Sequence, residues 1–269
     1  MVLITGASSG MGRATAKFLA NNDFIVYAGT RDVKKLQELY HPNIIPLTLD
    51  ITNQANILSA VTQIKKEHKT IDVLINNAGY GLVSTVEDVS EEEMFEQFNI
   101  NVFGLLRVTK SVIPLMRENR AGVIINISSF LGKIGLPLLT LYNSSKYAVE
   151  GITDSLRYEL KDFNIRVHSI MPGFFDTNFA RDNLVTNAKT FKANSPYSKL
   201  VSNLAPVIVQ QINSGNSPDE IGDMILEIIQ NENYQARVTI GDKAEKFIPM
   251  RKELSDEDFE RRVRDYYEL

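Results

Sequence analysis

Short runs of apolar residues, rich in Val and Ile, alternate along the chain with longer segments in which apolar residues recur at helical spacing. Such alternation is typical of a parallel β-sheet covered by helices. We predict seven strands, at residues 2–5, 24–29, 44–49, 71–76, 122–128, 165–170 and 236–240. The pattern therefore predicts an α/β protein built on one doubly wound parallel sheet.

Helix signals lie between these strands. We predict helices near residues 11–21, 33–40, 54–68, 91–118, 142–162 and 218–230. Ser90 and Glu93 form a capping-box pattern. Ser217 is a second cap residue, because Pro218 follows it at the first helical position and Glu220 stands three residues after it.

Two regions fall outside the regular alternation. Residues 174–215 form a long irregular stretch after the sixth strand, and long loops of this kind are usually lids or binding segments. The tail at 243–269 contains Ser255, a cap for a last helix with apolar residues at helical spacing. This helix either covers a substrate cleft or docks as an ordinary surface helix. We treat residues 1–269 as a single domain.

The composition is that of a globular protein with a large core. Of the 269 residues, 43% are hydrophobic and 23% charged, and the formal charge of −4 gives no basic surface for nucleic acid. Without cysteine, disulfides, thiolate catalysis and thiolate metal sites are excluded. His41, His68 and His168 lack metal-like spacing, so we expect structural roles for them and no metal.

The first six residues lack a basic segment, and their apolar stretch stops at Gly6, unlike a secretory signal. The chain also contains no apolar run of transmembrane length. We therefore expect a cytoplasmic protein without membrane or nucleic-acid partners that acts on a small molecule.

Candidate chemistry centres on Tyr142 and Lys146, which are four residues apart and share one face if the segment is helical. A nearby ammonium favours phenolate and lowers the pKa of a tyrosine from its usual value near 10. The spacing alone is common, so other motifs must support it.

A glycine-rich turn joins the first strand to the first helix. Glycines there let the backbone approach a pyrophosphate, which the helix N-terminus then binds. The alternative is a tight turn that binds nothing. The candidate contacts of this turn are Gly6, Ser8, Ser9, Gly10, Met11 and Gly12.

The spacing Gly-x-x-x-Gly-x-Gly resembles the short-chain dehydrogenase/reductase family, and further family motifs follow in order over the first 180 residues. The resemblance implies a Rossmann fold with catalytic residues Asn101, Ser129, Tyr142 and Lys146. Ser129 is preferred to Ser128 because it precedes Tyr142 by thirteen residues, the usual family spacing.

The resemblance also implies further cofactor contacts. Asp50 and Ile51 follow the third strand, on the adenine side. The remaining implied contacts are Asn77, Ala78 and Gly79 after the fourth strand, Tyr142 and Lys146, and Pro172, Gly173 and Thr177 beside the nicotinamide.

At the end of the second strand, Thr30 occupies the usual acidic position and Arg31 follows it. This favours NADP(H) over NAD, because a guanidinium pairs with a 2′-phosphate. Asp32 weakens this argument if the register is shifted.

In this scheme Tyr142 donates a proton to a substrate oxygen that Ser129 orients, while hydride moves between cofactor and carbon. The residues before Tyr142 and in 174–215 favour an apolar or bulky carbonyl or alcohol substrate, and the alternative is that they only pack the lid.

Within the family, the first 180 residues look most like the hydroxysteroid and retinol dehydrogenase subgroup. The family resemblance also implies pairing of copies through residues 91–118 and 142–162, and therefore a homodimer or homotetramer. The alternative functions are a non-catalytic NADP-binding regulator or redox sensor, and a related enzyme that uses bound nicotinamide for epimerisation or dehydration.

Overall fold

In the computed structural model, which describes residues 1–177 and 179–269, the chain forms one seven-stranded parallel sheet in the order β3-β2-β1-β4-β6-β7-β9. The order reverses between β1 and β4, which makes the sheet doubly wound as predicted. The strands are β1 (Val2–Thr5), β2 (Val26–Thr30), β3 (Ile44–Thr48), β4 (Val73–Asn76), β6 (Gly122–Ile127), β7 (Ile165–Pro172) and β9 (Arg237–Ile240).

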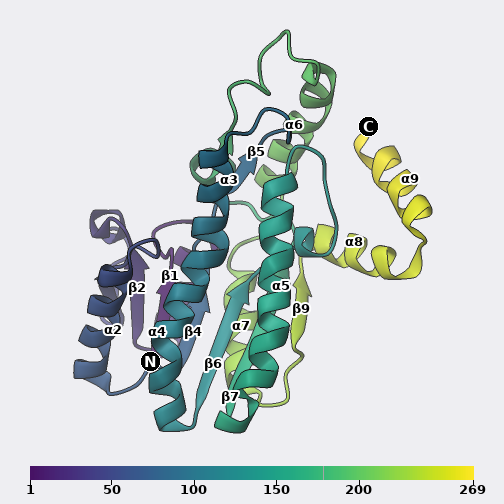
Figure 1. The fold of residues 1–269 in the computed structure, drawn as a ribbon. Helices are drawn as coiled ribbons and strands as arrows, with labels where there is room; N and C mark the ends of the chain where they lie inside the picture. Colours follow the sequence, from purple (N-terminus) through teal and green to yellow (C-terminus); the bar gives the residue numbers. More distant parts are fainter. Residues whose placement is uncertain (178) are drawn as a thin grey trace.

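Helices cover both faces of this sheet. On one face lie α2 (Gln54–His68), α4 (Leu105–Asn119) and α5 (Thr140–Leu160), seen side by side in Figure 1; on the other lie α1 (Gly10–Asn21) and α7 (Glu220–Gln230). Successive strand residues point to opposite faces, so Ile4 packs with α1 and α7 while Leu3 packs with α2 and α4. Within the described residues, no helix is long and apolar enough to cross a membrane.

The prediction of one helix over 91–118 is confirmed in its extent, because the helical backbone runs without a break from Glu91 to Asn119, but the helix is not regular throughout. The structure has α3 (Glu91–Phe98), a π-helical segment (Asn99–Gly104) and then α4. The capping box of Ser90 and Glu93 is confirmed at the start of α3. A π-helical segment inserts an extra residue into the helical ladder and is frequent at functional sites.

The prediction that residues 174–215 are irregular is wrong. It contains a π-helical turn (Phe179–Asn183), a strand β8 (Leu184–Thr186) and a helix α6 (Ser198–Asn213). Strand β8 pairs in parallel with β5 (Gly81–Val83), a three-residue strand too short for its periodicity to be detected. Leu204, Ile208 and Ile212 form the buried face of α6.

The tail forms two helices, α8 (Asp242–Glu253) and α9 (Asp256–Tyr267), drawn in yellow in Figure 1. Ser255 caps α9 as predicted, by accepting a hydrogen bond from the amide of Asp258. Phe259, Val263 and Tyr267 of α9 are buried in a cluster shared with α6 and α8.

Two further predicted helices differ in extent. Residues 33–40 contain only a short 3₁₀ helix (Val33–Leu36). Helix α7 begins at Glu220 with Asp219 as its N-cap, so the prediction that Ser217 caps this helix is wrong, although the amide of Ser217 donates to the carboxylate of Glu220 at 3.2 Å. The N-cap of the 3₁₀ helix is Asp32, whose carboxylate accepts from the amide of Lys34 at 3.0 Å.

Candidate active site

The glycine-rich turn lies at the carboxyl end of β1, packed against the end of β4. Gly6 and Gly10 have φ values of +67° and +52°, which favour glycine. A Cβ on Gly6 would lie 2.8 Å from Cα of Ala78, and one on Gly12 would lie 2.4 Å from Nδ2 of Asn77. Glycine at these positions therefore allows the turn to pack closely against the residues that follow β4.

Asn77 joins this turn to β4. Its Nδ2 donates to the carbonyl oxygens of Thr5 and Gly6, both at 3.0 Å. The hydroxyl of Thr5 accepts from the amides of Asn77 and Ala78, also at 3.0 Å. The loop after β4 and the turn thus form one rigid wall.

This wall fits a dinucleotide pyrophosphate. Ser9 is the N-cap of α1, and among the described residues its side chain makes no capping hydrogen bond, which leaves the first amides of the helix for a ligand. Ser8 and Met11 are partly exposed in the same turn. Thr177 lies next to the turn, since a Cβ on Gly10 would be 3.6 Å from the Cβ of Thr177.

The other predicted cofactor contacts lie at the same edge of the sheet. Arg31 is exposed immediately after β2. Asp50 follows β3 and accepts from the amide and hydroxyl of Thr52 at 2.9 and 2.7 Å, while Ile51 is buried against Gly104. Pro172 ends β7, and the amide of Gly173 donates to the carbonyl of Ile240 at 2.8 Å.

Tyr142 and Lys146 lie one turn apart near the start of α5. The Nζ of Lys146 is 5.6 Å from the centroid of the Tyr142 ring and donates to the carbonyl of Ile127 at 2.9 Å. Ser129, two residues beyond β6, caps a short 3₁₀ helix by accepting from the amide of Leu131 at 3.1 Å. Ser128 is buried, and within the described part of the chain its hydroxyl has no partner.

Asn101 occupies the π-helical segment and is buried. Its Oδ1 accepts from the amide of Tyr80 at 3.0 Å, and its Nδ2 donates to the carbonyl of Tyr80 at 2.8 Å and to the hydroxyl of Ser145 at 3.0 Å. A Cβ on Gly79 would lie 3.1 Å from Oδ1 of Asn101 and 3.9 Å from Nζ of Lys146. The π-helical segment therefore brings Asn101 close to the lysine.

Two supporting residues were missed from the sequence. Gln97 is fully buried; it accepts from the amide of Leu82 and donates to the carbonyl of Tyr80, both at 2.8 Å. Ser145 binds Asn101 and also donates to the carbonyl of Tyr142 at 2.7 Å. The only sequence signal for Ser145 was its position beside Lys146.

The electrostatics of the pair differ from the prediction. Burial raises the pKa of Tyr142 to about 12, and its interaction with Ser129 only partly opposes this. Burial lowers the pKa of Lys146 to about 8, although the negative charge of Glu150 acts in the opposite direction and raises it. The prediction of a lowered tyrosine pKa is wrong for this arrangement, because burial of the phenol raises the pKa of Tyr142 by more than its hydrogen bond with Ser129 lowers it.

Apolar side chains from the 174–215 segment enclose the Tyr142 ring. The ring centroids of Tyr142 and Phe179 are 6.3 Å apart. Gly81 of β5 allows the close packing, since a Cβ there would lie 3.1 Å from Leu184 and 3.4 Å from Tyr142. In the described ranges, no group of three or more His, Cys, Asp or Glu side chains has the arrangement of a metal site.

Comparisons with known proteins give a consistent result. The family model described as short chain dehydrogenase matches residues 1–187. The chain is 38% identical to a 3-ketodihydrosphingosine reductase of Bacteroides thetaiotaomicron, over 90% of this chain and 87% of the relative. It is 34% identical to the mouse dehydrogenase/reductase SDR family member 7B, over 89% of this chain and 73% of the relative.

Solved structures agree. A short-chain dehydrogenase from Streptomyces avermitilis superposes with a TM-score of 0.84 at 28% identity, covering 99% of this chain and 97% of that one. A short-chain dehydrogenase from Burkholderia cenocepacia in complex with NADP has the same fold, with a TM-score of 0.75 at 24% identity, over 99% and 96% of the two chains. The chain therefore belongs to the short-chain dehydrogenase family, whose fold is that of nicotinamide-dependent oxidoreductases.

Proposed function

We propose that the protein is an NADP-dependent oxidoreductase that interconverts a carbonyl and a secondary alcohol, with Tyr142 as acid and base. The observation that carries the proposal is the convergence of Tyr142, Lys146, Ser129 and Asn101 beside the glycine-rich turn. These groups come from α5, the loop after β6 and the π-helical segment, so an accidental grouping is a weak alternative.

The chemistry assigns one task to each side chain. The bound nicotinamide supplies the hydride for the carbonyl carbon. Ser129 donates a hydrogen bond to the carbonyl oxygen, and Tyr142 donates its proton to that oxygen as negative charge develops there. A tyrosine with a pKa raised to about 12 stays protonated at neutral pH, which suits a proton donor. Lys146 provides positive charge beside the phenol, and Asn101 lies near Lys146, on the other side of Gly79.

The residues that would hold the cofactor are distributed along the carboxyl edge of the sheet. The Gly6–Gly12 turn would bind the pyrophosphate, and Lys146 would bind the nicotinamide ribose. Asp50 and Ile51 would contact the adenine. The segment 77–79 and the residues Pro172, Gly173 and Thr177 would contact the nicotinamide half.

Arg31 is the residue that favours NADP over NAD. The competing acid, Asp32, uses its carboxylate to cap the following 3₁₀ helix, so Arg31 is the group left to meet a 2′-phosphate. We expect Arg31→Ala to weaken NADPH binding by about 10- to 100-fold, the loss of charge-assisted hydrogen bonds. Fluorescence titration with both cofactors measures this. NADH binding is the internal control, and an equal loss for both cofactors would contradict the assignment.

The apolar surroundings of Tyr142 support a bulky or apolar substrate. Phe179 and Leu184 from the lid, and the buried Leu136 and Leu139 before α5, belong to the cluster around this ring. Because a Bacteroides relative is a 3-ketodihydrosphingosine reductase, a long-chain 3-keto amine is a suitable first compound.

The test is a panel of ketones and aldehydes of increasing chain length, each incubated with NADPH and with NADH. We expect NADPH oxidation that becomes more efficient with longer apolar chains. Tight NADPH binding without turnover across the whole panel would replace this proposal with the non-catalytic regulator. A cytoplasmic location stays a prediction from the sequence.

We also propose a homodimer or homotetramer that pairs through α3, α4 and α5. Phe95 and Phe103 are 62% and 41% exposed, and Leu106 and Tyr147 are exposed nearby in these elements. We expect Phe103→Glu to shift the protein to monomers in size-exclusion chromatography with light scattering, because it places charge in an apolar contact. Tyr40→Glu, at another exposed aromatic residue, is the control. A wild-type monomer would contradict the proposal.

A further inference from the structure

Glu150 is a buried carboxylate one helical turn beyond Lys146. Its side chain is only 4% exposed. Tyr142, Lys146 and Glu150 follow one another at intervals of four residues, so they lie along one face of α5. A carboxylate at this depth is strongly unfavourable unless it is paired and hydrogen-bonded.

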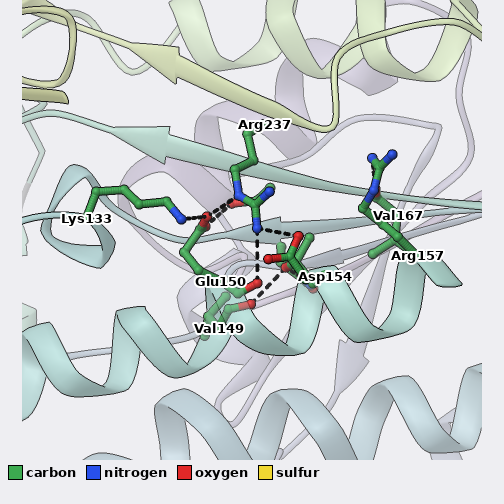
Figure 2. Close-up of polar contacts among 10 residues, drawn as sticks. Lys133, Val149, Glu150, Asp154, Arg157, Val167 and Arg237 are labelled. Atoms are coloured by element: carbon green, nitrogen blue, oxygen red, sulfur yellow. Dashed lines mark hydrogen bonds and ion pairs between the residues drawn. The ribbon is translucent and has the colours of Figure 1, made fainter. Parts of the chain in front are cut away.

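Three donors surround this carboxylate, from β7, from β9 and from the end of the 3₁₀ helix (Phe130–Gly132). Its Oε2 accepts from Nε of Arg237 on β9 at 2.7 Å and lies 3.2 Å from Nζ of Lys133. Its Oε1 accepts from the hydroxyl of Ser169 on β7. Figure 2 shows Lys133 and Arg237 converging on Glu150. A set of three donors fits the ionised form, which only accepts hydrogen bonds.

The cluster is also balanced and closely packed. Arg237 pairs a second time, with Oδ1 of Asp154 at 2.5 Å, so two cations face two anions. Gly132, next to Lys133, presses against α5: a Cβ there would lie 3.0 Å from the carbonyl of Lys146 and 3.2 Å from Cγ of Glu150. The carboxylate is therefore fixed in position relative to Lys146.

The groups facing Lys146 make Glu150 its main counter-charge. The other side chains of the site are neutral: Asn101 in the π-helical segment, Ser129 in the loop after β6 and Tyr142 on α5. Lys133 and Arg237 lie beyond Glu150 and reduce its influence. Burial disfavours the charged form of Lys146, and the charge of Glu150 favours it.

We propose that Glu150 is a positioning residue of the active site, a clamped buried carboxylate that keeps Lys146 in its ammonium form beside Tyr142. Lys133 and Arg237 fix this carboxylate, and their positive charges oppose its effect on Lys146. The catalytic consequence rests on the proposed oxidoreductase function, whereas the charge relation between Glu150 and Lys146 can be measured without any substrate.

The test is a pH titration of the Lys146 side chain by NMR of protein labelled with ¹⁵N at lysine Nζ, with the signal assigned from Lys146→Met. In Glu150→Gln we expect the pKa of Lys146 to fall by about one unit or more, because the opposite charge is removed. In Lys133→Met we expect it to rise, because an opposing cation is removed. Glu150→Asp, which keeps the charge, should stay close to wild type.

The matched control is Glu159→Gln, the same change at an exposed position of α5. An unchanged pKa of Lys146 in a folded Glu150→Gln protein would overturn the proposal. If Glu150→Gln does not fold, Lys133→Met decides: its side chain is 34% exposed, and the absence of a rise there would overturn the proposal. A shift in the titration without turnover on the carbonyl panel would refute the proposed reaction and leave the charge relation intact.

Discussion

Tyr142→Phe should lower kcat for carbonyl reduction by about 10²- to 10⁴-fold, the usual contribution of a general acid. The ring and its packing against Phe179 are kept, and only the hydroxyl is lost. NADPH binding should stay within about twofold of wild type, because the phenol is one of many predicted contacts. Steady-state kinetics on the best substrate of the panel, with NADPH titrations, measures both.

The control is Tyr158→Phe, the same change on the same helix at a side chain that is 83% exposed. It should leave kcat unchanged. The reverse reaction gives a second check with a definite sign. Alcohol oxidation needs the phenolate, and since the pKa of Tyr142 is raised to about 12, wild-type oxidation should increase as the pH rises above neutrality. Turnover in Tyr142→Phe close to that of wild type would remove the proton-transfer role.

The sheet could be predicted because its strands are buried on both faces. All residues of Val2–Thr5 and Val73–Asn76 are buried, so the strands read as short continuous apolar runs between helical patterns. The prediction of α9 succeeded for a similar reason, since Ser255 and the apolar spacing are local signals. In these elements burial and capping are encoded within a few residues, so the sequence could predict them.

The missed features depend on contacts between distant residues. The π-helical segment is stabilised by the bonds of Asn101 to Tyr80 and Ser145, which are 21 and 44 residues away. Glu150 looked like an ordinary polar helix residue, because Ser169 and Arg237 are 19 and 87 residues distant. No local sequence pattern indicates such pairings.

A buried network of asparagine side chains is a further feature that depends on contacts between distant residues. Asn76 donates to Thr109 and to Asn126, and Asn126 donates to Thr153, all at 2.9 Å. Asparagine at the end of a strand usually indicates a turn, yet here it ties β4 and β6 to α4 and α5 beneath the site. The network fixes the helix that carries Tyr142 relative to the sheet that carries the glycine-rich turn.

Gly12→Ala should reduce NADPH affinity by more than about tenfold and lower the melting temperature. The new Cβ would lie 2.4 Å from Nδ2 of Asn77 and 2.5 Å from the carbonyl oxygen of Gly6. To relieve these close contacts, Asn77 would have to move. Because Asn77 donates hydrogen bonds to the carbonyls of Thr5 and Gly6, its movement would displace the wall that is predicted to face the pyrophosphate. Overpacking of this kind costs about 1–3 kcal/mol, or roughly 2–4 °C for each kcal/mol in a chain of this size.

Gly151→Ala is the matched control, because a Cβ at that position of α5 meets nothing within 4 Å. It should stabilise the protein by about 0.5–1 kcal/mol through the helix propensity of alanine, without changing NADPH affinity. Titration calorimetry and thermal denaturation of both variants separate the two effects. If Gly12→Ala bound NADPH as tightly as Gly151→Ala, the turn would not be the pyrophosphate site, and the tight-turn alternative would replace it.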